Sequence, residues 1–133
     1  MEQKDVEQKV LSVIGTAYRA TVEEQDDTVL WLTHMLKSAG LDMAVLLRAN
    51  AVNYTVRGQD SSGLRFGKLE VLHPPKLDAD LAALLDHGVP VYYVADDART
   101  RGIAPTAVID GVQSVSADDL PSLFADYEQV WLW

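Results

Sequence analysis

The stretch Val89-Pro90-Val91-Tyr92-Tyr93-Val94-Ala95-Asp96-Asp97-Ala98-Arg99-Thr100-Arg101-Gly102 decides which fold we expect for this chain. Its first half is rich in β-branched and aromatic residues, which predicts a buried strand. Two aspartates follow at once, and a short segment compatible with a helix then stops at Gly102. In an open α/β sheet, ligands bind in the crevice beyond the carboxyl ends of the strands. A candidate site is therefore expected at Asp96 and Asp97.

Strand and helix patterns alternate on both sides of this stretch. Short apolar runs predict strands over 10–14, 41–47, 112–115 and 130–133. Helical patterns between them span about 21–38, 80–87 and 118–127. Such alternation is typical of a parallel sheet with helices on both faces. We predict one α/β domain over residues 1–133, a three-layer sandwich with a mostly parallel sheet of about five strands.

Two connections allow more than one interpretation. Asp110-Gly111 suits the tight turn of a hairpin, which is the alternative to a further sheet strand over 112–115. Residues 52–79 form the least regular part of the chain. A turn at 60–63, flanked by 54–57 and 64–66, predicts a small hairpin there. This segment is either a lid or contact loop, or an insertion with little specified structure.

Composition excludes several classes of function. The 133 residues carry 20 acidic and 11 basic side chains, a formal net charge of −9, which disfavours nucleic acid and anionic membranes as partners. No apolar run reaches the roughly 18 residues of a membrane span, and the first residues lack a signal-peptide pattern. The absence of cysteine excludes disulfides, thiolate metal sites and thiol nucleophiles. We expect a cytoplasmic protein.

Polar residues follow three of the expected strands, and their side chains are expected to meet at one edge of the sheet. A small polar or anionic ligand would suit them, whereas ordinary capped loops are the alternative. Arg101 would orient an anion or pair with a neighbouring carboxylate. The candidate ligand-binding residues are Thr16, Tyr18, Arg48, Asn50, Asn53, Asp96, Asp97 and Arg101.

The two adjacent aspartates have two possible roles. They would bind a hard cation such as Mg²⁺ or raise one another's pKa for acid–base chemistry. Alternatively, one caps the short helix and the other is solvated. The histidines His34, His73 and His87 lack the spacing of a metal motif, and the glycines match no nucleotide-binding fingerprint. We therefore expect no metal and no cofactor.

Aromatic and apolar residues outside the core pattern indicate an interface. Trp31, Trp131 and Trp133 are best explained by packing or subunit contacts, because aromatic residues are enriched at interfaces and a terminal edge strand needs covering. The helix over 21–38 has an apolar band too wide for one contact face. Either a second subunit covers it or it lies deep in its own domain.

The stretch around Asp96, together with residues 9–14 and the ending from Ile109 to Trp133, resembles the DsrE/DsrF-like family of small intracellular sulfur-relay proteins. The resemblance covers nearly the whole chain. It implies a compact cytoplasmic α/β subunit that assembles into a dimer, trimer or hexamer. In members that carry sulfur, a cysteine lies at the end of the central strand, near the position of Val94. This chain lacks that cysteine.

Three functions follow as hypotheses. The leading one is a cysteine-less DsrE-like subunit that binds a small ligand or a partner protein at the strand-end crevice, without covalent sulfur transfer. The first alternative is an enzyme that uses the carboxylates of Asp96 and Asp97 with Tyr18 or Thr16, with or without a metal ion. The second is an accessory subunit of a sulfur-relay complex, supporting a paralogue that has the cysteine.

Overall fold

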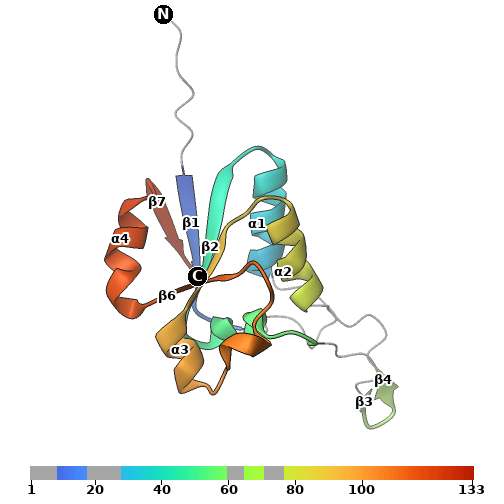
Figure 1. Ribbon diagram of the computed structural model, residues 1–133. Coiled ribbons are helices and arrows are strands. Elements are labelled where there is room, and N and C mark those ends of the chain that lie inside the picture. The colour runs from blue at the N-terminus through green and yellow to red at the C-terminus, as the bar shows by residue number, and fades with distance from the viewer. Residues whose placement is uncertain (1–8, 18–27, 60–64, 71–76) are drawn as a thin grey trace, which may run out of the picture.

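A five-stranded parallel sheet forms the centre of the computed structural model, which describes residues 9–17, 28–59, 65–70 and 77–133. Its order is β6-β5-β2-β1-β7 (Figure 1). The strands are β1 (Lys9–Ile14), β2 (Asp42–Leu47), β5 (Val91–Val94), β6 (Gln113–Val115) and β7 (Gln129–Leu132). Every pairing within this sheet is parallel. The predicted α/β fold with about five strands is confirmed.

Helices cover both faces of the sheet. On one face lie α1 (Thr28–Ser38) and α2 (Leu77–Asp86), and α4 (Leu120–Ala125) lies on the other (Figure 1). A short helix, α3 (Ala95–Thr100), follows β5 directly. The described 3-10 turns are η2 (Ala49–Thr55), η3 (Pro105–Ala107) and η4 (Ala117–Asp119). The expected beginning of the first helix, over 21–27, lies outside the described residues.

The central strand β5 divides its side chains between two hydrophobic clusters. Val91 and Tyr93 point toward the face with α1 and α2, while Tyr92 and Val94 point toward α4. This alternation is the period of two that a strand imposes. Because both faces are covered, the strand is apolar along its whole length, as parallel strands usually are. The predicted buried run is therefore explained by two cores, one on each face.

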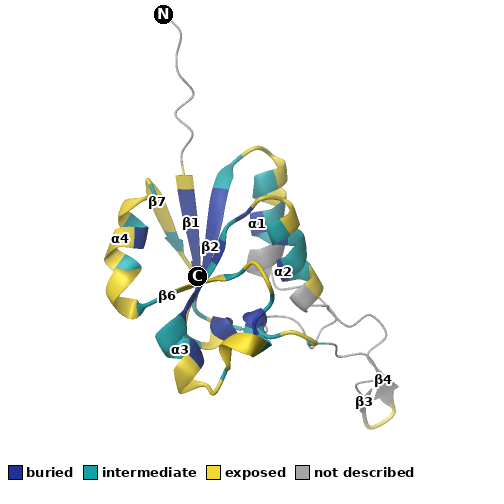
Figure 2. Ribbon diagram, in the orientation of Figure 1, coloured by how far each residue is buried: buried dark blue, intermediate teal, exposed yellow. Residues whose placement is uncertain are grey.

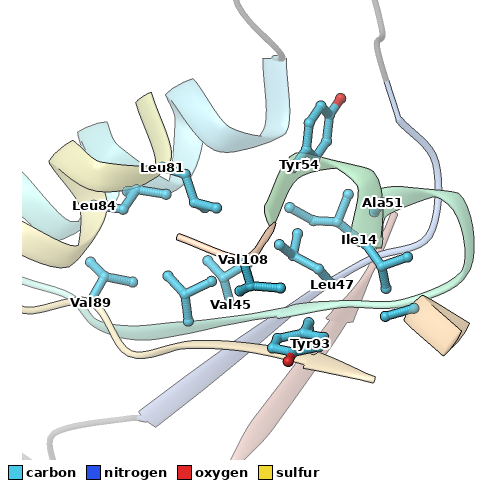
Figure 3. Close-up of a cluster of buried hydrophobic side chains, with 13 residues drawn as sticks. Ile14, Val45, Leu47, Ala51, Tyr54, Leu81, Leu84, Val89, Tyr93 and Val108 are labelled. Carbon is cyan, nitrogen blue, oxygen red and sulfur yellow. The ribbon is translucent and has the colours of Figure 1, made fainter. Parts of the chain in front are cut away.

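The larger cluster joins the sheet to α2 and η2 (Figure 3). Leu81 and Leu84 of α2 are almost fully buried against the sheet, and Tyr54 of η2 is fully buried. Complete burial of an apolar side chain contributes about 1.5–3 kcal/mol to stability. Figure 2 shows the burial concentrated in β1, β2 and this layer. The loop after β2 is thus held in place by its own core residues.

The segment after β2 differs from the predicted hairpin. Residues 54 and 55 belong to η2, where Tyr54 enters the core and the Thr55 hydroxyl donates to the Val52 carbonyl at 2.7 Å. The hairpin that forms instead pairs β3 (Arg65–Phe66) with β4 (Leu69–Glu70). Its two-residue loop begins at Gly67, whose φ of +64° suits glycine. The predicted pairing of 54–57 with 64–66 was wrong because the side chain of Tyr54 is buried in the core as part of η2. The turn predicted at 60–63 lies outside the described residues.

The structure decides the open question at Asp110-Gly111. β6 pairs with β5 in parallel, so the chain does not form a hairpin there. Gly111 turns the chain into β6 with a φ of +98°, a backbone conformation that favours glycine. The interpretation of 112–115 as a further strand of the sheet is therefore correct.

Candidate functional site

The loops after β1, β2 and β5 meet at one end of the sheet because these three strands are neighbours and run in parallel. The loop after β1 holds Thr16, η2 follows β2, and α3 follows β5. In Figure 1, α3 lies beside η2 at this end. The strand order thus brings candidate residues from three separate parts of the chain to one place.

Asp97 holds the beginning of η2. One carboxylate oxygen, Oδ2, accepts a hydrogen bond from the Ala49 amide at 2.7 Å. Ala49 has a φ of +49°, a left-handed conformation that costs a residue with a Cβ about 1–2 kcal/mol. Arg48, which precedes it at the N-cap position, offers no acceptor of its own. The carboxylate therefore serves as a cap supplied by a different element, and it offsets the strain at Ala49.

Asp96 holds the beginning of η4 in the same manner. Its Oδ2 accepts a hydrogen bond from the Ala117 amide at 2.7 Å, and its Oδ1 accepts one from Arg99 at 3.0 Å. The hydrogen bond from Ala117 lowers the pKa of Asp96, with a further contribution from Arg99, against a smaller opposing effect of desolvation. This carboxyl is therefore ionised at neutral pH and is a poor general acid.

The two carboxylates reach in different directions from adjacent positions. Asp97 reaches the loop after β2, and Asp96 reaches the loop after β6. Each caps a neighbouring 3-10 turn, and the N-cap residue of α3 makes no side-chain cap bond. The two carboxylates therefore cap two different 3-10 turns. The sequence had predicted either a cation or acid–base site, or one cap for α3 and one solvated carboxylate.

Arg101 and Asn50 form the polar centre of this end of the sheet. The Arg101 Nε and Nη2 groups donate to the Asn50 Oδ1 atom at 3.1 and 3.0 Å, and Nη1 donates to the Asp97 carbonyl at 3.2 Å. Asn53 donates from Nδ2 to the Asn50 carbonyl at 2.9 Å. Asn50, Asn53, Asp97 and Arg101 thus belong to one connected network, of which Arg101 and Asn50 are exposed.

Arg48 lies between the ends of β1 and β2. Its Nη1 atom would be 3.3 Å from a Cβ placed on Gly15, so the guanidinium passes over the beginning of the loop that holds Thr16. The side chain is exposed, and within the described ranges no ion pair or hydrogen bond engages its guanidinium. Thr16 is exposed nearby, whereas the predicted site residue Tyr18 lies outside the described residues.

Two side-chain contacts that shape the site could not be predicted from the sequence. Gln59 donates to the Asn53 and Val56 carbonyls at 2.6 and 2.9 Å, which holds the end of η2. The indole of Trp133 donates to the buried Ser12 hydroxyl at 2.8 Å, beside the end of β1. Glutamine in a loop and tryptophan in an edge strand have many uses, so only the folded chain assigns these roles.

Among the described residues, no group of three or more histidine, aspartate or glutamate side chains is placed to hold a metal ion. Over the same residues, no helix combines the length and the apolar character needed to cross a membrane.

Comparisons with known proteins match this chain at the level of the fold. No protein-family model matches it, and no curated protein matches it. The YchN protein from E. coli is similar in structure, with a TM-score of 0.72, 22% identity, and coverage of 96% of this chain and 100% of that one. BT1422 from Bacteroides thetaiotaomicron, a conserved protein of unknown function, has a TM-score of 0.69 and 12% identity over 99% of this chain and 100% of that one.

A third solved structure is also similar. MTH1491 from Methanobacterium thermoautotrophicum, also of unknown function, has a TM-score of 0.63 and 13% identity, and the match covers 93% of this chain and 98% of that one. All three matches span nearly the full length of both chains. At these identities the likeness establishes the shared α/β fold.

Proposed function

We propose that this chain is a cytoplasmic, cysteine-less subunit of the DsrE/DsrF-like type, which binds an anionic group of a small ligand or partner protein at the strand-end crevice. The fold shared with proteins of similar length supports this assignment. Without a cysteine, the subunit has no thiol with which to carry sulfur itself. Its role is to bind, and it forms no covalent intermediate with sulfur.

The observation that carries this proposal is the different use of acidic and basic groups in the crevice. Both carboxylates are engaged by backbone amides, at Ala49 and Ala117. The Arg48 guanidinium is exposed beside the end of β1, with no partner among the described residues. Arginine binds carboxylate and phosphate groups through its fork of donors. An anion is therefore a better fit than a metal-assisted reaction at the aspartates.

Native mass spectrometry of protein purified without added ligand tests this proposal first. A defined extra mass on the subunit would identify the ligand class. Inorganic phosphate and succinate then serve as probes in ¹H–¹⁵N NMR titrations, and we expect shifts concentrated in residues 15–17 and 48–53. Arg48→Gln should abolish these shifts.

Arg57→Gln is the matched control for the anion test. Arg57 is also an exposed arginine, but Asp110 and the Thr106 carbonyl already engage it. The substitution Arg57→Gln should therefore leave binding of the anionic probes unchanged. Equal losses in both variants would contradict a site at Arg48. If the protein turns over a substrate, and this activity is lost in Asp96→Asn or Asp97→Asn, the result would instead favour the hypothesis of an enzyme that uses these carboxylates.

We further propose that the subunit forms a homo-oligomer through β7. This strand is the last in the sheet order, and Val130, Leu132 and Trp133 are 36%, 74% and 40% exposed (Figure 2). The four residues of β7 carry no charge that would discourage another strand. A second copy pairing antiparallel through its own β7 buries these side chains by two-fold symmetry. Such a contact fits a dimer or a hexamer.

Light scattering after size-exclusion chromatography tests the β7 contact. We expect Leu132→Lys to convert the oligomer into smaller species, because a lysine would be buried at the centre of the contact. Met35→Lys is the control, since Met35 is 50% exposed but lies on α1. Dissociation in Met35→Lys but not in Leu132→Lys would show that the interface is at α1. A monomeric wild-type protein would exclude an interface at either element.

A further inference from the structure

His34 and His87 lie side by side in the helical layer on one face of the sheet. His34 belongs to α1, and His87 follows the last residue of α2. Their ring centroids are 4.4 Å apart, and the ring planes meet at 66°. The two positions are far apart in the sequence, so their spacing showed no metal motif. The packing of α1 against α2 creates the pair.

The distance between the rings suits two ligands of one metal ion. With Zn–N bonds of about 2.0–2.1 Å, a ring centroid lies about 3.2 Å from the ion. Two imidazoles that subtend an angle between a right angle and the tetrahedral angle then have centroids about 4.5–5.2 Å apart. The observed 4.4 Å in this edge-to-face pair is just below this range. Binding one ion therefore requires the rings to separate slightly and to turn one nitrogen each toward it.

The surroundings of the pair favour a cation. Both histidines are in or next to the last turn of a helix, where the carbonyl ends of the helix carry partial negative charge. Asp86 precedes His87 and offsets the single positive charge of Lys37 in the last turn of α1, and the chain as a whole has a formal charge of −9. His87 is exposed and His34 is half-buried, so water has access to the remaining coordination positions.

We propose that His34 and His87 form a two-imidazole site for Zn²⁺ or another divalent transition metal that prefers nitrogen ligands, with water in the remaining positions. Imidazole suits zinc, copper and nickel, and suits Mg²⁺ poorly. The bound ion bridges α1 and α2 and stabilises the layer that covers the larger core. The site is separate from the crevice and does not depend on the function proposed for it.

Isothermal titration of Zn²⁺ into untagged, chelator-treated protein tests this site. We expect one Zn²⁺ per chain, a higher unfolding temperature with Zn²⁺ and no effect of Mg²⁺. His34→Asn and His87→Asn should each weaken Zn²⁺ binding by at least about tenfold, because each removes one of two protein ligands. Hydrogen exchange should slow at the C-terminal turns of α1 and α2 when Zn²⁺ is added, and only with both histidines present.

His73→Asn is the matched control, since it also removes one imidazole but leaves the pair intact. Binding that survives in this variant and is lost in the other two supports the site. Equal loss in all three variants would show binding to imidazoles in general and would overturn the proposal. So would unchanged binding in His34→Asn and His87→Asn, which would leave the pair as an edge-to-face ring contact. Unfolding temperatures without Zn²⁺ verify that each variant is folded.

Discussion

Asp97 supplies a side-chain cap to an element to which it does not belong. Removing the carboxylate in Asp97→Ala leaves the Ala49 amide without its acceptor and leaves the left-handed conformation of Ala49 uncompensated. We expect unfolding to become easier by about 1 kcal/mol, as for other lost caps. Urea denaturation measures this loss.

The conservative variant Asp97→Asn separates the hydrogen bond from the charge. Its amide oxygen still accepts from Ala49, so most of the stability should be retained. If alanine and asparagine destabilise the protein equally, the carboxylate charge, and not the hydrogen bond, holds η2.

Ionisation of Asp96 makes the free energy of unfolding depend on pH in the acidic range. The pKa of this carboxyl is lowered in the folded state, so it binds a proton less readily there than in the unfolded chain. Its contribution to stability is present above the unfolded value of 3.8 and is lost as the pH falls through the lower folded value. We expect Asp96→Asn to flatten the decline of urea stability between pH 4 and pH 3. An unchanged decline would mean that other carboxyls dominate acid unfolding.

The candidate residues could be selected from the sequence, but their partners could not. The position of Asp96 and Asp97 after a buried strand was enough to place them at the carboxyl end of the sheet. Their acceptor roles depend on Ala49 and Ala117, which are remote in the chain and contribute only backbone amides. Backbone donors have no residue type, so no pattern of side chains could indicate them.

At the scale of elements, the strand patterns were predictable because burial on both faces makes the internal strands β1, β2 and β5 largely apolar. The last helix was also predictable, since Leu120, Leu123 and Phe124 form its apolar face and Pro121 is in its first turn. The segment of η2 was not predictable, because Tyr54 suits a strand or a buried turn equally. Tyr54 lies in the turn because its side chain packs in the same buried cluster as Leu81 and Leu84 of α2.

Tyr127, just after α4, links this helix to β5. Burial raises the pKa of Tyr127 well above its ordinary value of 10, and a hydrogen bond with Tyr92 and the nearby Asp42 and Asp126 add to the shift. The folded state therefore resists ionisation of this phenol, whereas the unfolded chain releases its proton from about pH 10. Stability must fall as the pH rises above 10.

The variant Tyr127→Phe tests the alkaline effect. Phenylalanine has no proton to release, so the decline of urea stability between pH 10 and pH 11 should be shallower than in the wild type. Absorbance at 295 nm during the same titration should show one tyrosine fewer that ionises only on unfolding in Tyr127→Phe than in the wild type. A normal titration of all five tyrosines in the folded protein would contradict the link.

At the scale of the whole molecule, alternation of strands and helices predicted the layers but not the strand order. The order β6-β5-β2-β1-β7 makes β1 an internal strand, paired with β2 on one side and with β7 on the other. Right-handed crossovers are possible in several orders. The choice depends on which neighbour buries β1 best, and β1 provides Ser12 as a specific partner for the indole of Trp133.

That hydrogen bond adds to the ladder between β1 and β7 by joining Trp133, which follows β7, to Ser12 of β1. Trp133→Phe leaves the fully buried Ser12 hydroxyl without the indole donor, and we expect a loss of about 1 kcal/mol in the free energy of unfolding. Trp131→Phe is the matched control, because its indole donates to Gln129 on the exposed part of the same strand. Equal effects of the two variants would indicate lost ring packing and not the Ser12 bond.

The pairing of β1 with β7 also has a consequence for how the chain folds. The register joins Val10 to Gln129 and Val13 to Leu132, so these contacts close a loop of more than a hundred residues. Closing a loop of this length is slow, because the chain loses conformational entropy before the contacts between β1 and β7 form. β1 can pair with β2 early, but its other edge must wait for the far end of the chain. We therefore expect the β1–β7 ladder to form after the β1–β2 ladder, and until β7 is in place the edge of β1 is open to other strands, including that of another copy.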